Sequence, residues 1–209
     1  MKKDYRTIKR SGRDELIEKK SRFIATVRPV TTEAEALSLI QDMRKEFSDA
    51  NHNVYAYIVR ENNIARYSDD GEPGGTAGMP VMEVLKQEDL TDVAVVVTRY
   101  FGGTKLGAGG LVRAYSKATK MGIDKGIISI MTDCTLLQIT VQYDQYNRLQ
   151  YLLEQEGLTI EDATFGQDVA ATVCIRTQDL EDLQKKIIES TNGSAACSVL
   201  FSEYRPLAI

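Results

Sequence analysis

Histidine, cysteine and long apolar runs are all scarce in this chain of 209 residues. His52 is the only histidine, which excludes a histidine-rich metal site. A catalytic serine triad would have to use His52 as its base, and the chain contains no G-x-S-x-G motif. The three cysteines do not make a disulfide framework. No apolar run approaches the length of about 18 residues that a membrane-spanning helix needs, and the basic N-terminus lacks the apolar region of a signal peptide. We therefore expect a cytoplasmic protein without a membrane segment.

The charges are divided unevenly along the chain. Lys and Arg total 26 and Asp and Glu total 30, which gives a net charge of −4. Residues 1–130 carry 21 basic and 18 acidic side chains, a balance of +3, whereas residues 131–209 carry 5 and 12, a balance of −7. Asymmetry of this kind favours an anionic partner for the N-terminal half, but small domains also vary by several charges without such a partner. Both interpretations stay open.

The pattern of the first 130 residues predicts an α/β unit with two glycine-rich loops. The apolar run at 92–101 is typical of a strand covered on both faces, and we expect Gly122 and Gly126 to end the helix that follows it. In chain order we expect a strand at 22–30, a helix introduced by a Thr32–Glu35 capping box, a hairpin of strands at 53–60 and 64–68, a loop at 69–80, a helix at 81–87, a strand at 92–101, a loop at 102–110 and a helix through residue 120.

A second cycle of elements follows residue 130. The order strand-helix-strand-strand-helix-strand is that of the split βαβ, ferredoxin-like unit. We expect strands at 136–142, 158–164, 169–175 and 195–204, with helices capped by Asp144 and Thr177. The sequence therefore predicts an α+β protein with an N-terminal domain at 1–130 that carries both glycine loops and a ferredoxin-like C-terminal domain at 131–209.

Nine of the 15 glycines lie between Gly71 and Gly110. Such a concentration indicates backbone at positive φ, or backbone that another molecule approaches closely. The second loop lies between a buried strand and a helix N-terminus, where free N–H groups favour an anion. The alternative is two tight loops packed on each other beneath a solvated basic helix face. The candidate anion-binding or nucleic-acid-binding residues are Arg99, Gly102, Gly103, Lys105, Gly107, Gly109, Gly110, Arg113, Lys117 and Lys120.

The first loop supplies acidic candidates beside these residues. Asp69, Asp70 and Glu72 could hold Mg²⁺ next to a phosphate, but Asp-Gly is ordinary turn chemistry and the turn interpretation is favoured. The possible partners from this loop are Asp69, Asp70, Glu72, Gly74, Gly75 and Thr76. Neither the Walker A motif nor the dinucleotide fingerprint fits the second loop. Tyr100 and Phe101 could stack on a base, although packing is the commoner role of aromatic residues at a strand end. We expect His52 to be a partly exposed residue before a strand rather than a site residue.

The two glycine loops resemble the signatures of the Impact/YigZ family. The matching segments are YSDDGEPGGTAGMPVMEVL at 67–85 and VVVTRYFGGTKLGAGGLVRAYSKA at 95–118, and the resemblance extends over nearly the whole chain. It implies an N-terminal domain with the left-handed βαβ fold of a ribosomal protein's second domain, which also occurs in elongation factor G and in GHMP kinases. It also implies a ferredoxin-like C-terminal domain similar to another domain of elongation factor G. Eukaryotic members regulate translation by competing for an activator of a starvation-responsive kinase, a pathway that bacteria lack.

Two functions follow as hypotheses. The first is a non-catalytic, translation-linked regulator that binds RNA or the ribosome through the basic glycine-loop surface, with Arg22 and the basic N-terminal tail extending it. The second is a Mg²⁺-dependent enzyme or binder of a nucleotide or phosphorylated metabolite, with Lys105 facing a phosphate. The sequence offers no recognisable nucleophile, so we name no catalytic residue and no cofactor under the first hypothesis, and we prefer it. A protein partner of the acidic C-terminal domain is a third possibility, and the pattern does not predict an oligomeric state.

Overall fold

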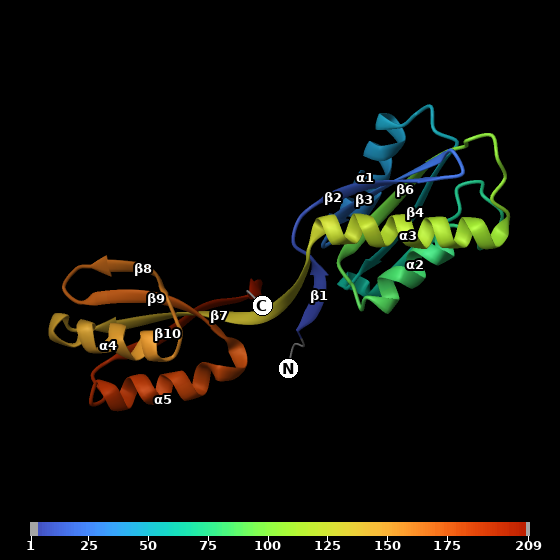
Figure 1. Ribbon diagram of the computed structural model, residues 1–209. Helices are drawn as coiled ribbons and strands as arrows, with labels where there is room; N and C mark the ends of the chain where they lie inside the picture. The colour runs from blue at the N-terminus through green and yellow to red at the C-terminus, as the bar shows by residue number, and fades with distance from the viewer. Residues whose placement is uncertain (1–3, 208–209) are drawn as a thin grey trace. The chain divides into compact units, whose positions relative to one another are not determined.

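The computed structural model describes residues 4–207, which divide into two compact units (Figure 1). One unit spans Tyr5–Ile130, and the other contains Met131–Leu207 with Asp4. The elements of the first unit are β1 (Tyr5–Ile8), β2 (Gly12–Glu18), β3 (Ser21–Pro29), α1 (Glu33–Glu46), β4 (His52–Val59), the 3-10 turn η1 (Glu61–Asn63), β5 (Ile64–Ser68), α2 (Gly78–Gln87), β6 (Val93–Tyr100) and α3 (Ala108–Gly126).

The N-terminal unit is built on a sheet with the strand order β2-β3-β6-β4-β5. Both β3 and β4 pair antiparallel with β6, so they run parallel to each other on either side of it. Helix α1 connects these two parallel strands and completes a βαβ unit. The expected capping box starts this helix, because the Thr32 hydroxyl accepts a hydrogen bond from the Glu35 N–H at 3.3 Å.

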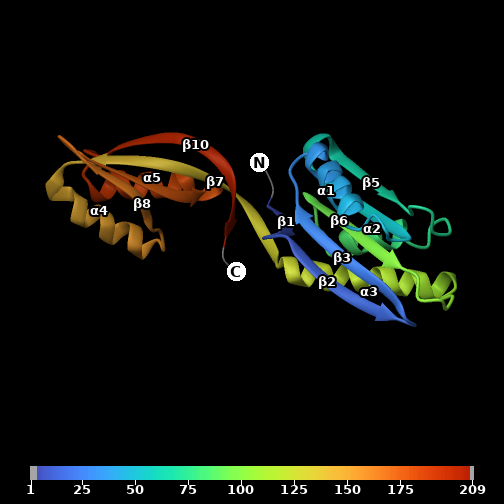
Figure 2. The same ribbon diagram turned by 90° about the horizontal axis from the view of Figure 1, so that it is seen from above.

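Strand β6 lies at the centre of the sheet and is buried on both faces, as its apolar run predicts. Val93, Val95 and Val97 pack in one apolar cluster with side chains from α2 and α3, whereas Ala94 and Val96 pack in another with side chains from α1. Figure 2 shows α1 on one side of the sheet and α3 on the other. The end of β6 and the start of α3 therefore lie at one edge of the packed core, with the second glycine loop between them.

Three features of this unit differ from the sequence-based expectation. The segment before Ser21 contains the strands β1 and β2, although no strand was predicted there. Helix α3 begins at Ala108, inside the expected loop, so Gly109 and Gly110 belong to its first turn. It ends at Gly126 as expected, but Gly122 lies within it, where a Cβ atom would come within 3.0 Å of the Ala25 side chain. Gly122 thus permits close packing of α3 on β3 instead of ending the helix.

The C-terminal unit has the ferredoxin-like order of elements. Strand β7 pairs with β9 and with β10, and β9 pairs with β8, so the strand order is β10-β7-β9-β8. Leu149 and Leu153 of α4 and Leu183 and Ile187 of α5 are buried in the apolar cluster of this sheet. The elements are β7 (Ile128–Val141), α4 (Tyr143–Gln155), β8 (Ile160–Phe165), β9 (Val169–Arg176), the 3-10 turn η2 (Thr177–Asp179), α5 (Leu180–Ser190) and β10 (Ala196–Leu207).

Both capping residues predicted for the C-terminal helices are wrong. The N-cap of α4 is Gln142, and Asp144 lies in the first turn of the helix. The N-cap of α5 is Asp179, because Thr177 starts the 3-10 turn that precedes the helix. None of the helices between residues 4 and 207 is both long and apolar enough to cross a membrane.

Candidate functional site: a pocket and a basic groove at the second glycine loop

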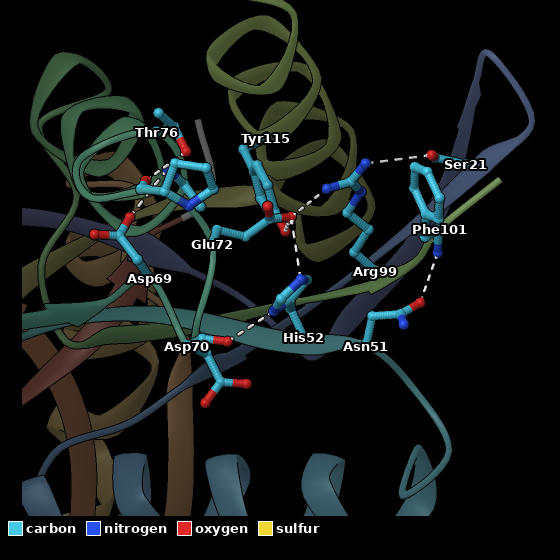
Figure 3. Close-up of polar contacts among 12 residues, drawn as sticks. Ser21, Asn51, His52, Asp69, Asp70, Glu72, Thr76, Arg99, Phe101 and Tyr115 are labelled. Atoms are coloured by element: carbon cyan, nitrogen blue, oxygen red, sulfur yellow. Dashed lines mark hydrogen bonds and ion pairs between the residues drawn. The ribbon is translucent and has the colours of Figure 1, made fainter. Parts of the chain in front are cut away.

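A pocket of about 490 Å³ opens where β6 ends and α3 begins. We call it the loop pocket. Both glycine loops contribute to it, together with the start of β4, so it brings together segments that are far apart in the sequence (Figure 3). Its lining residues are Asn51, His52, Glu72, Pro73, Arg99, Phe101, Lys105, Leu106, Gly107, Ala108 and Leu111.

A buried ion pair forms the floor of the loop pocket. Oε1 of Glu72 lies 2.5 Å from Nη1 of Arg99 and accepts a second hydrogen bond from the Tyr115 hydroxyl at 2.8 Å. Burial raises the pKa of Tyr115, and the neighbouring Glu72 carboxylate raises it further, so this hydroxyl stays protonated and donates. Glu72 therefore neutralises Arg99, which the sequence had placed among the phosphate contacts.

Two aromatic rings enclose the Arg99 guanidinium. Its central carbon lies 5.3 Å from the ring centre of Phe23 and 5.6 Å from that of Phe101, both within cation–π range. Nη2 lies 3.4 Å from the Ser21 hydroxyl, whereas the buried Nε has no hydrogen-bond partner among residues 4–207. The Phe101 N–H donates to the Asn51 side chain at 2.7 Å, which fixes the backbone that carries this exposed ring (Figure 3).

His52 lies beside the ion pair with one ring nitrogen committed to the backbone. Its Nδ1 is 2.8 Å from the carbonyl oxygen of Asp70, and because a carbonyl only accepts, Nδ1 carries the proton. In the neutral ring Nε2 is then an acceptor, and it lies 3.9 Å from Oε1 of Glu72. His52 is the first residue of β4 and lines the pocket. The sequence pattern did not place His52 among the candidate site residues, and the structure adds it to them.

The acidic residues of the first loop stabilise the loop itself. Oδ1 of Asp69 accepts hydrogen bonds from the N–H groups of Ala77 and Gly78, and Oδ2 accepts from that of Gly75. Asp70 accepts from the Arg44 guanidinium and from the Asn53 N–H. The structure thus supports the turn interpretation of the two aspartates. Within residues 4–207 no group of three or more His, Cys, Asp and Glu side chains is placed to hold a metal ion.

The other site candidates of the first loop, Gly74, Gly75 and Thr76, determine the conformation of the loop backbone. The Thr76 hydroxyl donates to the Pro73 carbonyl oxygen at 2.6 Å. Gly75 has a φ of 74°, which favours glycine, and Gly74 is exposed with open space around it. Glu72 and Pro73 are the residues by which this loop reaches the pocket.

A second hollow, of about 210 Å³, lies next to the loop pocket. Leu106 lines both. We call this hollow the basic groove, since Lys19, Arg113 and Lys117 line it with Glu18 as its one acidic residue. All three cations are exposed, as is Lys105.

The absence of an ion-pair partner in the part of the chain that the structure describes is common to the four exposed cations Lys19, Lys105, Arg113 and Lys117. Two other candidates are already paired. Lys120 contacts Glu88 at 2.8 Å and Asp124 at 3.3 Å, and Arg22 binds Glu15 at 2.9 Å. The predicted stripe on α3 therefore contributes Arg113 and Lys117 to the groove. Residues 1–3 of the basic tail lie outside the described residues.

The tight turn between β2 and β3 places Lys19 at this groove. Lys19 and Lys20 have φ values of 45° and 68° and form a two-residue hairpin loop between the paired residues Glu18 and Ser21. Such turns favour Asn-Gly or Gly-containing pairs, because both central residues need positive φ. No local pattern predicts this turn, since Lys-Lys lacks that preference. Gly102 packs against it so closely that a Cβ atom would lie 2.0 Å from the Lys20 carbonyl carbon.

The N-terminus of α3 faces the same loop with free backbone donors. Gly107 is the N-cap and supplies no side chain, and the first helical bond runs from the Leu111 N–H to the Gly107 carbonyl. The N–H groups of Ala108, Gly109 and Gly110 precede it and find no acceptor among residues 4–207. Free donors and the positive end of the helix dipole favour an anion at this position.

Comparisons with known proteins agree with this architecture. A family model described as the Impact N-terminal domain matches residues 19–123, and one described as a domain of unknown function (DUF1949) matches residues 139–194. The chain is 36% identical over 192 residues to "IMPACT family member YvyE" of Bacillus subtilis, covering 91% of this chain and 88% of that protein. It is 29% identical to "IMPACT family member YigZ" of Escherichia coli, covering 84% and 88%.

A solved structure confirms the likeness over the whole length. It is titled a crystal structure of a hypothetical protein, is 26% identical in sequence and superimposes with a TM-score of 0.61. The match covers 97% of this chain and all of that one. The first family model includes both glycine loops, the loop pocket and every residue of the basic groove except Leu16 and Glu18.

Proposed function

The chain belongs to the Impact family, and from this premise we propose that it is a non-catalytic, translation-linked regulator that binds RNA or the ribosome through its N-terminal unit. The observation that carries the proposal is the gathering of Lys19, Lys105, Arg113 and Lys117 around the second glycine loop without an acidic partner among the described residues. Free cations of this kind are what a phosphate backbone requires.

The distinction between free and paired cations decides how strongly this surface can bind. A cation that already contacts a carboxylate neutralises no phosphate unless that contact is broken, so Lys120 and Arg22 contribute little. The four free cations each release counterions when they meet a phosphate. For single strands, about 0.7 units of salt slope per contact gives a slope of about −3 for the four together.

The conformation of the Lys19–Lys20 turn supports the same proposal. Positive φ is unfavourable for lysine, and asparagine or glycine would relieve the cost. Backbone strain is typical of functional sites, so the positive φ of these two lysines points to a role for their side chains. Here the strain holds a lysine at the basic groove, next to Gly102.

Pelleting of purified ribosomes at low and moderate salt tests the proposal. The wild-type protein is expected to sediment with ribosomes at low salt, and the double variant Lys105→Glu with Arg113→Glu is expected to stay in the supernatant. The matched control is Arg148→Glu with Lys185→Glu, which makes the same change in net charge on exposed residues of the C-terminal unit. Sedimentation that is absent, insensitive to salt or lost equally in the control would overturn the proposal.

A further inference from the structure

The floor of the loop pocket contains two polar atoms that have no partner among residues 4–207, and both belong to buried side chains. The Arg99 and Glu72 side chains are only 7% and 3% exposed, and the buried Nε of Arg99 has no hydrogen-bond partner in the described part of the chain. All contacts of the Glu72 carboxylate, with Arg99, Tyr115 and His52, are made by Oε1. Its Oε2 has no partner within residues 4–207. Buried polar groups in proteins are normally satisfied, so unsatisfied atoms at the base of a pocket indicate a ligand.

The chemistry of the floor specifies which groups of a ligand would fit it. Oε2 of Glu72 is an acceptor. Nδ1 of His52 faces the Asp70 carbonyl oxygen, so in the tautomer with the proton on Nδ1 the Nε2 atom is a second acceptor close to the same carboxylate. Two neighbouring acceptors match two neighbouring N–H donors on one edge of a planar ring. The Watson–Crick edge of guanine, with its N1–H and its amino group, has this arrangement, whereas uracil offers a single N–H donor between two acceptor oxygens.

The walls of the loop pocket suit a planar ring. Pro73, Leu106 and Leu111 line it with apolar surface, and the Phe101 ring, 48% exposed, stands over the Arg99 guanidinium with part of its surface open. Aromatic side chains at such positions stack on bases. The volume of about 490 Å³ lies within the range of roughly 300–1,000 Å³ usual for small-molecule sites.

One side of the loop pocket carries groups that suit a phosphate. Lys105 is exposed and has no acidic partner among the described residues, and Gly107 and Ala108 bring the free N–H groups of the first turn of α3 to the same lining. These groups form an anion site at the helix N-terminus. Because the buried side chains of Glu72 and Arg99 line the same pocket, the anion site and the base-reading floor can be filled by one molecule.

We propose that the loop pocket binds one guanine nucleotide unit, with the base against Phe101, its N–H donors toward Glu72 and His52, and its phosphate at Lys105 and the N-terminus of α3. The inference rests on the proposed function in that the basic groove would hold the neighbouring phosphates of an RNA strand. The same unit also exists as a free mononucleotide, and the experiments below separate the two sources.

Titration calorimetry of the full chain measures the base preference. The probes are 5′-GMP, 5′-UMP, guanosine and inorganic phosphate at one ionic strength. GMP is expected to bind at a single site at least about fivefold more tightly than UMP, and more tightly than guanosine or phosphate. Equal affinity for GMP and UMP, or for GMP and inorganic phosphate, would overturn the inference.

Two variants locate the binding in the loop pocket. Phe101→Ala is expected to weaken GMP binding roughly tenfold, since it removes the stacking surface. Lys105→Gln is expected to weaken GMP binding and to leave guanosine binding unchanged. The matched control is Phe165→Ala, which removes another exposed ring, 58% against 48% for Phe101, from β8 in the C-terminal unit and should change neither affinity. Wild-type GMP affinity in Phe101→Ala would contradict the inference.

The failure of this inference is distinguishable from the failure of the proposed function. Binding of GMP is expected to be unchanged in Lys117→Glu, whose side chain lines the basic groove and not the loop pocket, whereas RNA binding is expected to fall. Salt-sensitive RNA binding without any GMP binding would overturn the nucleotide site and leave the RNA-binding proposal intact. GMP binding without RNA or ribosome binding would overturn that proposal and identify the free mononucleotide as the ligand.

Discussion

Nη1 of Arg99 lies 2.5 Å from Oε1 of Glu72, joining the end of β6 to the first glycine loop across 27 residues of sequence. Removal of one partner leaves a buried charge without compensation. Glu72→Ala is therefore expected to lower the free energy of unfolding by about 3–5 kcal/mol, measured by urea denaturation. Glu83→Ala is the control, because its pair with Lys86 is exposed and should contribute less than about 1 kcal/mol. A similar small loss for both variants would contradict a structural role for the buried pair.

Gly102 and Gly109 should respond oppositely to alanine. A Cβ atom on Gly102 would lie 2.0 Å from the backbone of Lys20, so Gly102→Ala must displace the β2–β3 turn and should lower the free energy of unfolding by about 1–3 kcal/mol. Gly109 lies in the first turn of α3, where its nearest neighbour would be the Arg113 side chain at 3.9 Å. Gly109→Ala should raise the free energy of unfolding by up to about 1 kcal/mol. Thermal unfolding of both variants checks the signs, and a stabilised Gly102→Ala would show that the turn does not pack there.

Asp69 stabilises the start of α2 through its side chain, since both of its carboxylate oxygens accept hydrogen bonds from backbone N–H groups at 2.8–3.0 Å. Asp69→Ala is expected to lower the free energy of unfolding by about 1–3 kcal/mol. It should also speed hydrogen exchange at residues 75, 77 and 78. Asp69→Asn keeps one acceptor oxygen and should fall between the alanine variant and the wild type. Unchanged exchange in Asp69→Ala would show that the cap contributes nothing.

The ion pair of Glu46 with Arg13 makes stability depend on pH in the acidic range. Hydrogen bonds from the Arg13 guanidinium, at 2.6 and 2.9 Å, hold the pKa of Glu46 below its usual value of 4.5. A carboxyl group with a lower pKa in the folded state stabilises the fold above its unfolded pKa, and this stabilisation is lost as pH falls through the folded pKa. Glu46→Gln should therefore flatten the loss of stability below about pH 4.5. Denaturation at a series of pH values measures this, with Glu154→Gln on an exposed helix position as the control. Parallel curves for Glu46→Gln and wild type would contradict it.

Local patterns were sufficient to predict much of the fold. The apolar run of β6 predicted a strand buried on both faces, and Thr32 with Glu35 predicted the start of α1, because each signal lies within a few neighbouring residues. The order of elements after residue 130 predicted the ferredoxin-like unit for the same reason. The Lys19–Lys20 turn escaped prediction because its residues oppose the conformation that they adopt.

The partners of the site residues could not be predicted in the same way. Arg99 and Lys120 belong to basic patterns in the sequence, but Glu72 lies 27 residues from Arg99 and Glu88 lies 32 residues from Lys120, so these carboxylates reach them only through the fold. The second partner of Lys120, Asp124, is one helical turn away. His52 belongs to no catalytic or metal-binding motif, and its place in the loop pocket results from the pairing of β4 with β6, which sets it opposite Arg99. Long-range contacts of this kind decide which cations remain free to bind an anion.

The salt dependence of binding to single-stranded RNA tests the central claim most directly. Fluorescence anisotropy with labelled RNA between about 50 and 200 mM salt should give a slope of log K against log salt of about −3 for the wild type. Replacing Lys19, Arg113 and Lys117 by glutamine should reduce the steepness by about 0.7 for each cation, while Lys120→Gln, whose side chain is already paired, should leave the slope nearly unchanged. Equal slopes for the wild type and the triple variant, or no binding by the wild type, would contradict the assignment of this surface to RNA.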